Sequence, residues 1–173
     1  MPKLAALALV VGVLAVIDTW LFGLPGLKAL NMQVWMSFIS WGVHFMAGGK
    51  TQGVKASALS MSFGALVGMG AALAIPHLAP LQGLAAPVAV GVGAAIIVVA
   101  SKVPLLEAIP AGFYGFAAIF ALIGLGAVAP TAALLPTILS VVVGSAFGYV
   151  SEIVTDILTK KDIALEPGVG QPT

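Results

Sequence analysis

The chain has 173 residues, of which 61% are hydrophobic and 8% are charged, and its mean hydropathy is +1.17. A chain of this composition cannot surround one soluble core with a polar surface, so we expect the protein in a lipid bilayer. The net charge of +1 gives no basic surface for nucleic acid. The sequence has no cysteine and no arginine, which excludes disulfide, thiolate and guanidinium chemistry, and its two histidines are too few for a recognisable metal cluster.

Six nearly charge-free segments are long enough to cross a bilayer, which requires about 20 apolar residues. They are residues 3–23, 31–48, 53–75, 83–101, 107–127 and 132–158. The first has Asp18 and Trp20 where a signal peptide would carry its small-residue cleavage pattern, so we interpret it as a retained helix. The sequence predicts an all-α membrane protein with one transmembrane domain over residues 1–159 and a flexible cytoplasmic tail over residues 160–173.

Lysines gather on one side of this predicted topology, with Lys28 alone on the other. The lysines on the first side are Lys3, Lys50, Lys55, Lys102, Lys160 and Lys161. Cytoplasmic loops retain positive charge, so this bias predicts a multi-pass inner-membrane protein with both termini in the cytoplasm. The alternative is that the lysines are scattered without topological meaning.

Two halves of the chain, residues 3–75 and 83–158, share three matches in the same order. Leu24–Leu30 matches Val103–Ile109 at an offset of 79 residues, an aromatic stripe recurs at an offset of 75, and a Leu-Ser-x-x-x-Gly-x-x-x-Gly motif recurs at an offset of 80. Because each half crosses the membrane three times, the second half must be inverted relative to the first. The sequence therefore predicts six transmembrane helices in a 3+3 inverted repeat, an arrangement common in transporters. Chance recurrence of small and aromatic residues is the alternative.

Small residues and hydroxyls follow one face of the third and sixth segments. These residues are Ser60, Gly64 and Gly68, and Ser140, Gly144 and Gly148. Small residues let membrane helices approach closely, so the four glycines are expected to serve helix packing. The same smooth face leaves room for a narrow path, and the two serines are candidates for hydroxyls that line it.

The duplicated aromatic stripe allows two interpretations. It consists of Phe38, Trp41 and Phe45 in the second segment, and Phe113, Phe116 and Phe120 in the fifth. If the rings face inward, inversion brings two clusters together as a constriction that passes small, weakly hydrated solutes and disfavours free ions. If they do not, they face lipid or fill the core.

Two ionisable residues lie inside predicted spans. Asp18 is near the outer end of the first segment and His44 is near the inner end of the second, so no direct contact between them is expected. Both are candidate polar entrances, because ionisable residues within a membrane are functional hypotheses. The alternatives are an interfacial Asp18 and a His44 that serves packing. Glu152 and Asp156, one helical turn apart, are expected at the solvated inner end of the last segment, where they could favour cations.

No catalytic motif emerges from the sequence. Gly48-Gly49-Lys50-Thr51 matches the end of a phosphate-binding loop, but His44 stands where that motif requires glycine. No serine lies in a G-x-S-x-G motif, and neither histidine has a recognisable catalytic arrangement. We therefore expect no enzyme, no cofactor, no metal and no nucleic-acid partner.

Four segments carry a resemblance to a known family. They are Trp35–Gly49, Gly53–Ser60, Ile109–Phe120 and Gly144–Tyr149. The sequence resembles the bacterial family catalogued as domain of unknown function 1097, over the second to sixth spans. The resemblance implies a small bacterial inner-membrane protein, and it assigns neither a substrate nor functional residues.

The leading hypothesis is a channel or facilitator for a small neutral or weakly charged solute, forming a homo-oligomer. A proton-coupled secondary transporter, in which Asp18 or His44 takes up a proton, is the first alternative. A non-transporting membrane subunit, whose glycine faces dock a partner or another copy, is the second.

Overall fold

The computed structural model describes residues 2–126 and 128–163, and every secondary-structure element in these ranges is helical. The elements are α1 (Lys3–Gly23), α2 (Pro25–Ala29), α3 (Val34–Met46), α4 (Lys50–Val54), η1 (Lys55–Ser60), α5 (Met61–Ala74), η2 (Ile75–Leu84), α6 (Ala85–Ala100), α7 (Ile109–Gly126) and α8 (Pro130–Ile163). The all-α prediction is confirmed.

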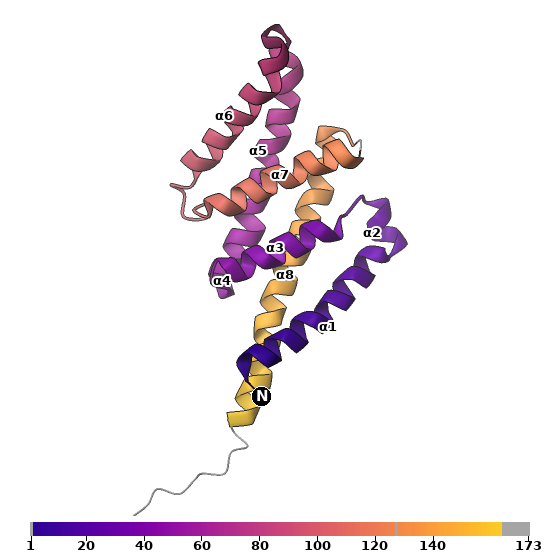
Figure 1. Cartoon of the computed structure of the whole chain (residues 1–173), viewed down its shortest axis with the longest axis vertical. Coiled ribbons are helices and arrows are strands. Elements are labelled where there is room, and N and C mark those ends of the chain that lie inside the picture. Colours follow the sequence, from indigo (N-terminus) through magenta and orange to yellow (C-terminus); the bar gives the residue numbers. More distant parts are fainter. Residues whose placement is uncertain (1, 127, 164–173) are drawn as a thin grey trace, which may run out of the picture.

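Long apolar helices make this chain a multi-pass membrane protein. Among the described residues, four helical stretches are long and apolar enough to cross a membrane: Lys3–Gly23, Lys50–Ala100, Ile109–Gly126 and Pro130–Thr159. The second stretch holds two of the segments predicted from the sequence. Its chain turns back at η2, where Gln82 leaves helical geometry with φ of 49°, so that α5 and α6 form a hairpin (Figure 1).

Helix α3 is shorter than its predicted segment, residues 31–48. It has 13 residues, and backbone with positive φ flanks it at Asn31 (57°), Gly48 (87°) and Gly49 (70°). At 1.5 Å per residue α3 is roughly 20 Å long, less than the ~30 Å of a bilayer core. The predicted segment begins three residues before α3 and ends two residues after it, because the chain turns at both ends.

Helices α4 and α5 are joined by a π-helical section into one continuous helical segment. Residues Lys55–Ser60 form a π-helix, η1, between α4 and α5. Short π-helical sections are rare and often occur at functional sites. Ser57 lies in this section, and its hydroxyl is 2.7 Å from the carbonyl oxygen of Gly53.

Two pairs of crossing helices build the centre of the molecule. Helix α3 packs along α8, α7 packs along α5, and α5 and α8 contact each other (Figure 1). Helix α1 packs on α8 at one edge, and α6 packs on α5 at the other. The helices are therefore held mainly by two crossings, α3 with α8 and α5 with α7.

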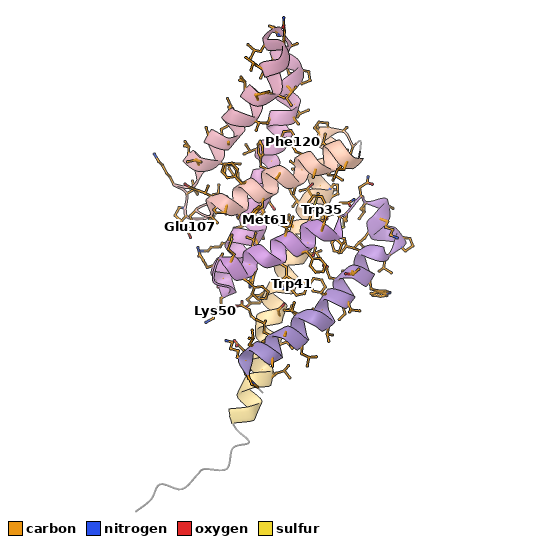
Figure 2. The ribbon with its side chains drawn as sticks, in the orientation of Figure 1. Trp35, Trp41, Lys50, Met61, Glu107 and Phe120 are labelled. Carbon is orange, nitrogen blue, oxygen red and sulfur yellow. The ribbon has the colours of Figure 1, made fainter. Side chains whose placement is uncertain are left out.

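Three polar contacts tie together one end of the bundle. Lys3 pairs with Asp156 at 3.3 Å, the Lys50 backbone N–H donates to Glu152 at 2.6 Å, and the Gln52 amide donates to Glu107. Figure 2 shows Lys50 and Glu107 on the same edge of the molecule. The N-terminus, the turn before α4, the loop before α7 and the last turns of α8 thus gather at one end, and α2 with Lys28 lies at the far end of α1.

The tail predicted over residues 160–173 stays a prediction. The backbone of α8 is helical to Ile163, and residues 164–173 lie outside the described residues.

Candidate functional site

Glycines allow the helix backbones to approach each other closely at both crossings. A Cβ added to Gly64 on α5 would overlap the carbonyl oxygen of Gly112 on α7, and a Cβ on Gly115 would overlap that of Met61. On the other crossing, a Cβ on Gly144 of α8 would overlap the carbonyl oxygen of Ser37 on α3. Backbones therefore touch directly, which is the packing that small residues permit in membranes.

The other two glycines of the duplicated motif also lie in contacts between these helices. A Cβ on Gly148 would lie 2.7 Å from the Cβ of His44, and one on Gly68 would lie 2.6 Å from Cγ2 of Ile119. All four glycines to which the sequence analysis assigned packing are thus found between helices.

Most of the buried polar side chains belong to the helices α1, α3 and α8. Those in the described part of the chain are Asp18, Ser37, Ser40, His44, Ser57, Ser60, Thr137, Ser140, Ser145, Ser151 and Thr155. They come from α1, α3, η1 and α8, whereas α6 and α7 contribute none to this set. We call this set the polar interface. Polar groups inside a membrane are expensive and face protein or water, so their gathering at one interface marks the candidate site.

The end of the polar interface near α2 contains Asp18. Its Oδ1 accepts a hydrogen bond from the Ser37 hydroxyl at 3.1 Å, while its Oδ2 is buried with no partner in the described part of the chain. One turn along α3, the Gln33 backbone N–H donates to the Ser140 hydroxyl at 3.0 Å. That hydroxyl donates in turn to the Pro136 carbonyl at 2.7 Å, so Ser140 holds the start of α3 against α8.

The end near α4 contains His44 and Glu152. The Glu152 carboxylate accepts from His44 Nε2 at 2.8 Å and from the Lys50 backbone N–H at 2.6 Å. His44 is fully buried, and its Nδ1 has no partner in the described residues. Glycine is required at Gly49, because φ is 70° there and a Cβ would overlap the Glu152 carboxylate. One carboxylate thus fastens both α3 and the following turn to α8.

Hydroxyls fill the interface between these two ends. Ser40 donates to the Val141 carbonyl at 2.6 Å, and the hydroxyls of Ser57 and Ser145 lie 2.7 Å apart. Ser37, Ser40 and His44 fall at i, i+3 and i+7, so they share one face of α3. Trp41 on the same helix has a buried ring N–H without a partner in the described residues.

Two cavities open beside the polar interface. One of about 320 Å³, near Asp18, is lined by Thr19, Phe22, Gly23, Lys28, Met32, Gln33 and Val34. Another of about 420 Å³, near the Ser57–Ser145 pair, is lined by Thr51, Val54, Ala58, Val142, Ser145, Ala146 and Tyr149. Each contains hydroxyl or amide groups among apolar side chains, as sites for small molecules do.

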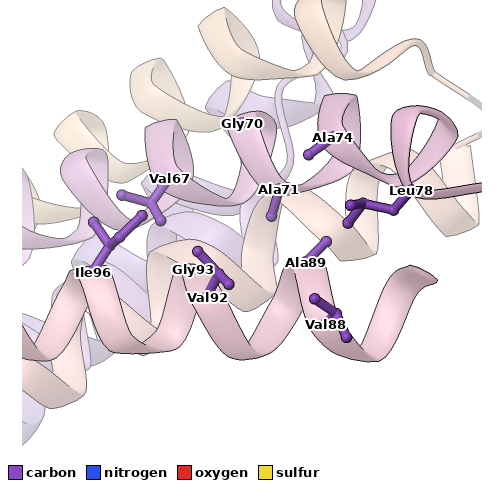
Figure 3. Close-up of a pocket in the computed structure, with 10 residues that line it drawn as sticks. All are labelled: Val67, Gly70, Ala71, Ala74, Leu78, Val88, Ala89, Val92, Gly93 and Ile96. Carbon is purple, nitrogen blue, oxygen red and sulfur yellow. The ribbon is translucent and has the colours of Figure 1, made fainter. Parts of the chain in front are cut away.

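A third groove, between α5 and α6, has a different character (Figure 3). It measures about 430 Å³ and is lined by Val67, Gly70, Ala71, Ala74, Leu78, Val88, Ala89, Val92, Gly93 and Ile96. No lining side chain carries a hydrogen-bonding group, so this groove suits hydrocarbon rather than a polar solute.

The predicted constriction is not assembled by ring contacts. Phe38 and Phe113 are 42% and 39% exposed at the outside of the molecule, and Trp41 packs against Phe38 and Phe147. Phe116 packs against Phe120 at 5.1 Å between centroids. Among the described residues no aromatic pair joins one trio to the other, so the constriction, with Phe45 as its third first-half ring, stays a prediction without a supporting contact.

Sequence reasoning found part of the polar interface. The candidate site residues Asp18, His44, Ser60 and Ser140 are all buried. Asp18 and His44 bond to different partners, as expected from their positions. Ser37, Ser40, Ser145 and the pairing of Glu152 with His44 were missed. The helical spacing of Ser37, Ser40 and His44 was a visible signal for a polar face on α3.

The long apolar helices, their backbone contacts at glycine and their buried polar interface define a polytopic α-helical membrane protein. The chain belongs to the family described as "Protein of unknown function (DUF1097)", which matches residues 8–156. No curated protein and no solved structure matches the chain.

Proposed function

We propose that this protein transports a small neutral or weakly charged solute across a membrane, along the interface of α1, α3 and α8. The observation that carries the proposal is the concentration of buried hydroxyls, Asp18 and His44 at that interface. Helix packing alone would be served by apolar side chains, as it is where α6 and α7 pack on α5. Hydroxyl groups at membrane depth supply the hydrogen bonds that a polar solute loses when it leaves water.

The 3+3 inverted repeat is part of this proposal, and equivalent contacts support it. Under the sequence offsets of 80 and 75, the contact of Gly144 with Ser37 corresponds to that of Gly64 with Gly112. The contact of Gly148 with His44 corresponds to that of Gly68 with Ile119.

Two further contacts in the first half also have an equivalent contact in the second half. The bond from Ser40 to the Val141 carbonyl corresponds to the approach of Gly115 to the Met61 carbonyl. If the offset of 79, found for the segment that follows the first helix of each half, is extended to that helix, the Asp18–Ser37 bond corresponds to the contact between Ile97 and Gly112. Four matched contacts favour the repeat over chance similarity between apolar helices.

The comparison of the two halves supports a division of roles. Ile97, Gly112, Gly115 and Ile119 of the second half take the places of Asp18, Ser37, Ser40 and His44. The α5–α7 crossing is thereby apolar and closely packed, as a fixed frame would be. The α3–α8 crossing carries the groups that a solute can use.

Cysteine labelling tests the proposed topology, in an inner membrane with both termini cytoplasmic. The chain has no native cysteine, so Lys28→Cys, Lys50→Cys and Lys102→Cys each give a single reactive site. We expect a membrane-impermeant maleimide to label Lys28→Cys in intact cells, and to label the other two only after the membrane is opened. Labelling of Lys50→Cys and Lys102→Cys from opposite sides of the membrane would contradict the six-span arrangement.

Vesicle swelling tests transport itself. Proteoliposomes holding the full chain should swell faster than empty vesicles with at least one class among small amides, polyols and weak acids. Ser145→Leu, which fills the cavity beside the Ser57–Ser145 pair, should slow the swelling several-fold because the side chain is buried at the polar interface. Val88→Leu in the apolar α5–α6 groove is the matched control and should leave the rate unchanged.

Permeability equal to that of empty vesicles for every solute would contradict transport. Co-purification with a partner protein would then favour the non-transporting subunit. The predicted homo-oligomer stays a prediction, to be measured by mass photometry of the same preparations.

A further inference from the structure

Asp18 is a buried carboxylate, and no described side chain supplies it with a compensating charge. It is 0% exposed and lies five residues before the end of α1 at Gly23. Its Oδ1 accepts one hydrogen bond, from Ser37, and its Oδ2 is buried without a partner among the described residues. An ionisable side chain at this depth in a membrane is costly unless a counter-charge, a proton or an ion satisfies it.

Among the side chains that the structure describes, no cationic group pairs with Asp18. The ion pairs among them are Lys3 with Asp156 and His44 with Glu152. These pairs involve His44 of α3 and both carboxylates of α8, and they lie toward the α4 end of the bundle. On α2, Lys28 lines the cavity next to Thr19 without forming a recorded pair with Asp18.

We propose that Asp18 and Ser37 form the binding site of a monovalent cation, a proton or Na⁺, whose movement is coupled to solute transport. The coupling rests on the proposed function, whereas the site stands on its own geometry. The free Oδ2 accepts the proton or ligates the ion, and the Ser37 hydroxyl, 3.1 Å from Oδ1 of the same carboxylate, is a further oxygen ligand or donor. Oxygen atoms are the ligands that hard cations prefer.

A cavity lies near the site. It is lined by Thr19, the residue after Asp18 on α1, and by Gln33, four residues before Ser37. Because this cavity lies at the α2 end of the bundle, we expect the cation to reach Asp18 from that side.

The second half of the chain cannot provide an equivalent site. Ile97 and Gly112 occupy the places of Asp18 and Ser37, and neither side chain can bind a cation. We therefore expect each chain to bind one cation.

Direct binding measurements on the purified full-length protein test the site without using transport. In the sodium arm, thermal unfolding is followed while Na⁺ replaces choline at constant ionic strength, and bound ligand raises the melting temperature. In the proton arm, infrared difference spectra follow the carboxylic acid C=O band as the pH is lowered. We expect one arm to give a response that Asp18→Asn removes, with one cation bound per chain.

Two further variants complete the test, one as a control and one within the proposed site. Asp156→Asn changes a carboxylate of the exposed Lys3 pair and should leave the response intact. In the sodium arm, Ser37→Ala keeps the carboxylate and removes the hydroxyl oxygen ligand, so apparent affinity for Na⁺ should fall about tenfold. A response in neither arm, or one that Asp18→Asn retains, would overturn the site. Cation binding together with absent permeability would instead overturn the proposed function alone.

Discussion

Gly64→Ala is expected to disrupt the α5–α7 crossing and to cause a large loss of stability for a single added methyl group. The new Cβ would overlap the carbonyl oxygen of Gly112, a backbone atom that cannot rotate away. Overpacking a well-filled interior costs about 1–3 kcal/mol even when side chains can adjust, so we expect a loss of about 3 kcal/mol or more. Thermal unfolding of the purified protein in detergent measures it.

Gly70→Ala on the same helix is the matched control. A Cβ at Gly70 has no neighbour within 4 Å, because the residue faces the open α5–α6 groove. Alanine is the better helix former by up to about 1 kcal/mol, so this variant should melt at the same temperature or higher. If the two variants melt together, direct backbone contact at Gly64 is wrong.

Glu152→Ala is expected to release the turn before α4 from α8. It leaves His44 Nε2 and the Lys50 backbone N–H without their shared acceptor. An unsatisfied buried polar group costs about 1–3 kcal/mol, and His44 is fully buried, so a loss in that range is expected. Trypsin should also cut faster after Lys50, and the few lysines of the chain make that cleavage easy to resolve.

Asp156→Ala, one turn further along α8, provides the comparison. It removes the exposed pair with Lys3, and exposed pairs contribute about 0–1 kcal/mol. The tryptic pattern at Lys50 should therefore match that of the unmodified protein. Equal melting temperatures and equal cleavage for the Glu152 and Asp156 variants would show that the carboxylate does not fasten the turn.

The fold class could be predicted because it depends on composition and local pattern. Runs of apolar residues separated by proline and glycine are enough to place helices in a membrane protein, and the boundaries of all six predicted segments agree with the structure within about five residues. Helix α3 is shorter than its segment at both ends, where Asn31, Gly48 and Gly49 adopt positive φ. Such turns depend on what the neighbouring helix supplies, here Ser140 and Glu152 from α8.

The candidate site was only partly predictable, because it depends on which helices meet. Asp18 and His44 stand out as ionisable residues in an apolar sequence, and the structure places both side chains in the interior. The serines of α3 and α8 are common residues in membrane helices, and only the α3–α8 crossing gives them a shared role. The aromatic stripes show the converse: each trio follows helical spacing, yet Phe38 and Phe113 face outward.

In the proposed six-span arrangement, the short α3 has an electrical consequence. Hydrophilic turns at Asn31 and at Lys50 bracket a helix of 13 residues, so we expect the insulating layer to be thinner there than the surrounding lipid. A unit charge that crosses a full membrane voltage of 100 mV exchanges about 2.3 kcal/mol with it. Where the insulator is thin the voltage gradient is steep, and an ion held beside α3 would feel a large fraction of the resting potential within a few ångströms of travel.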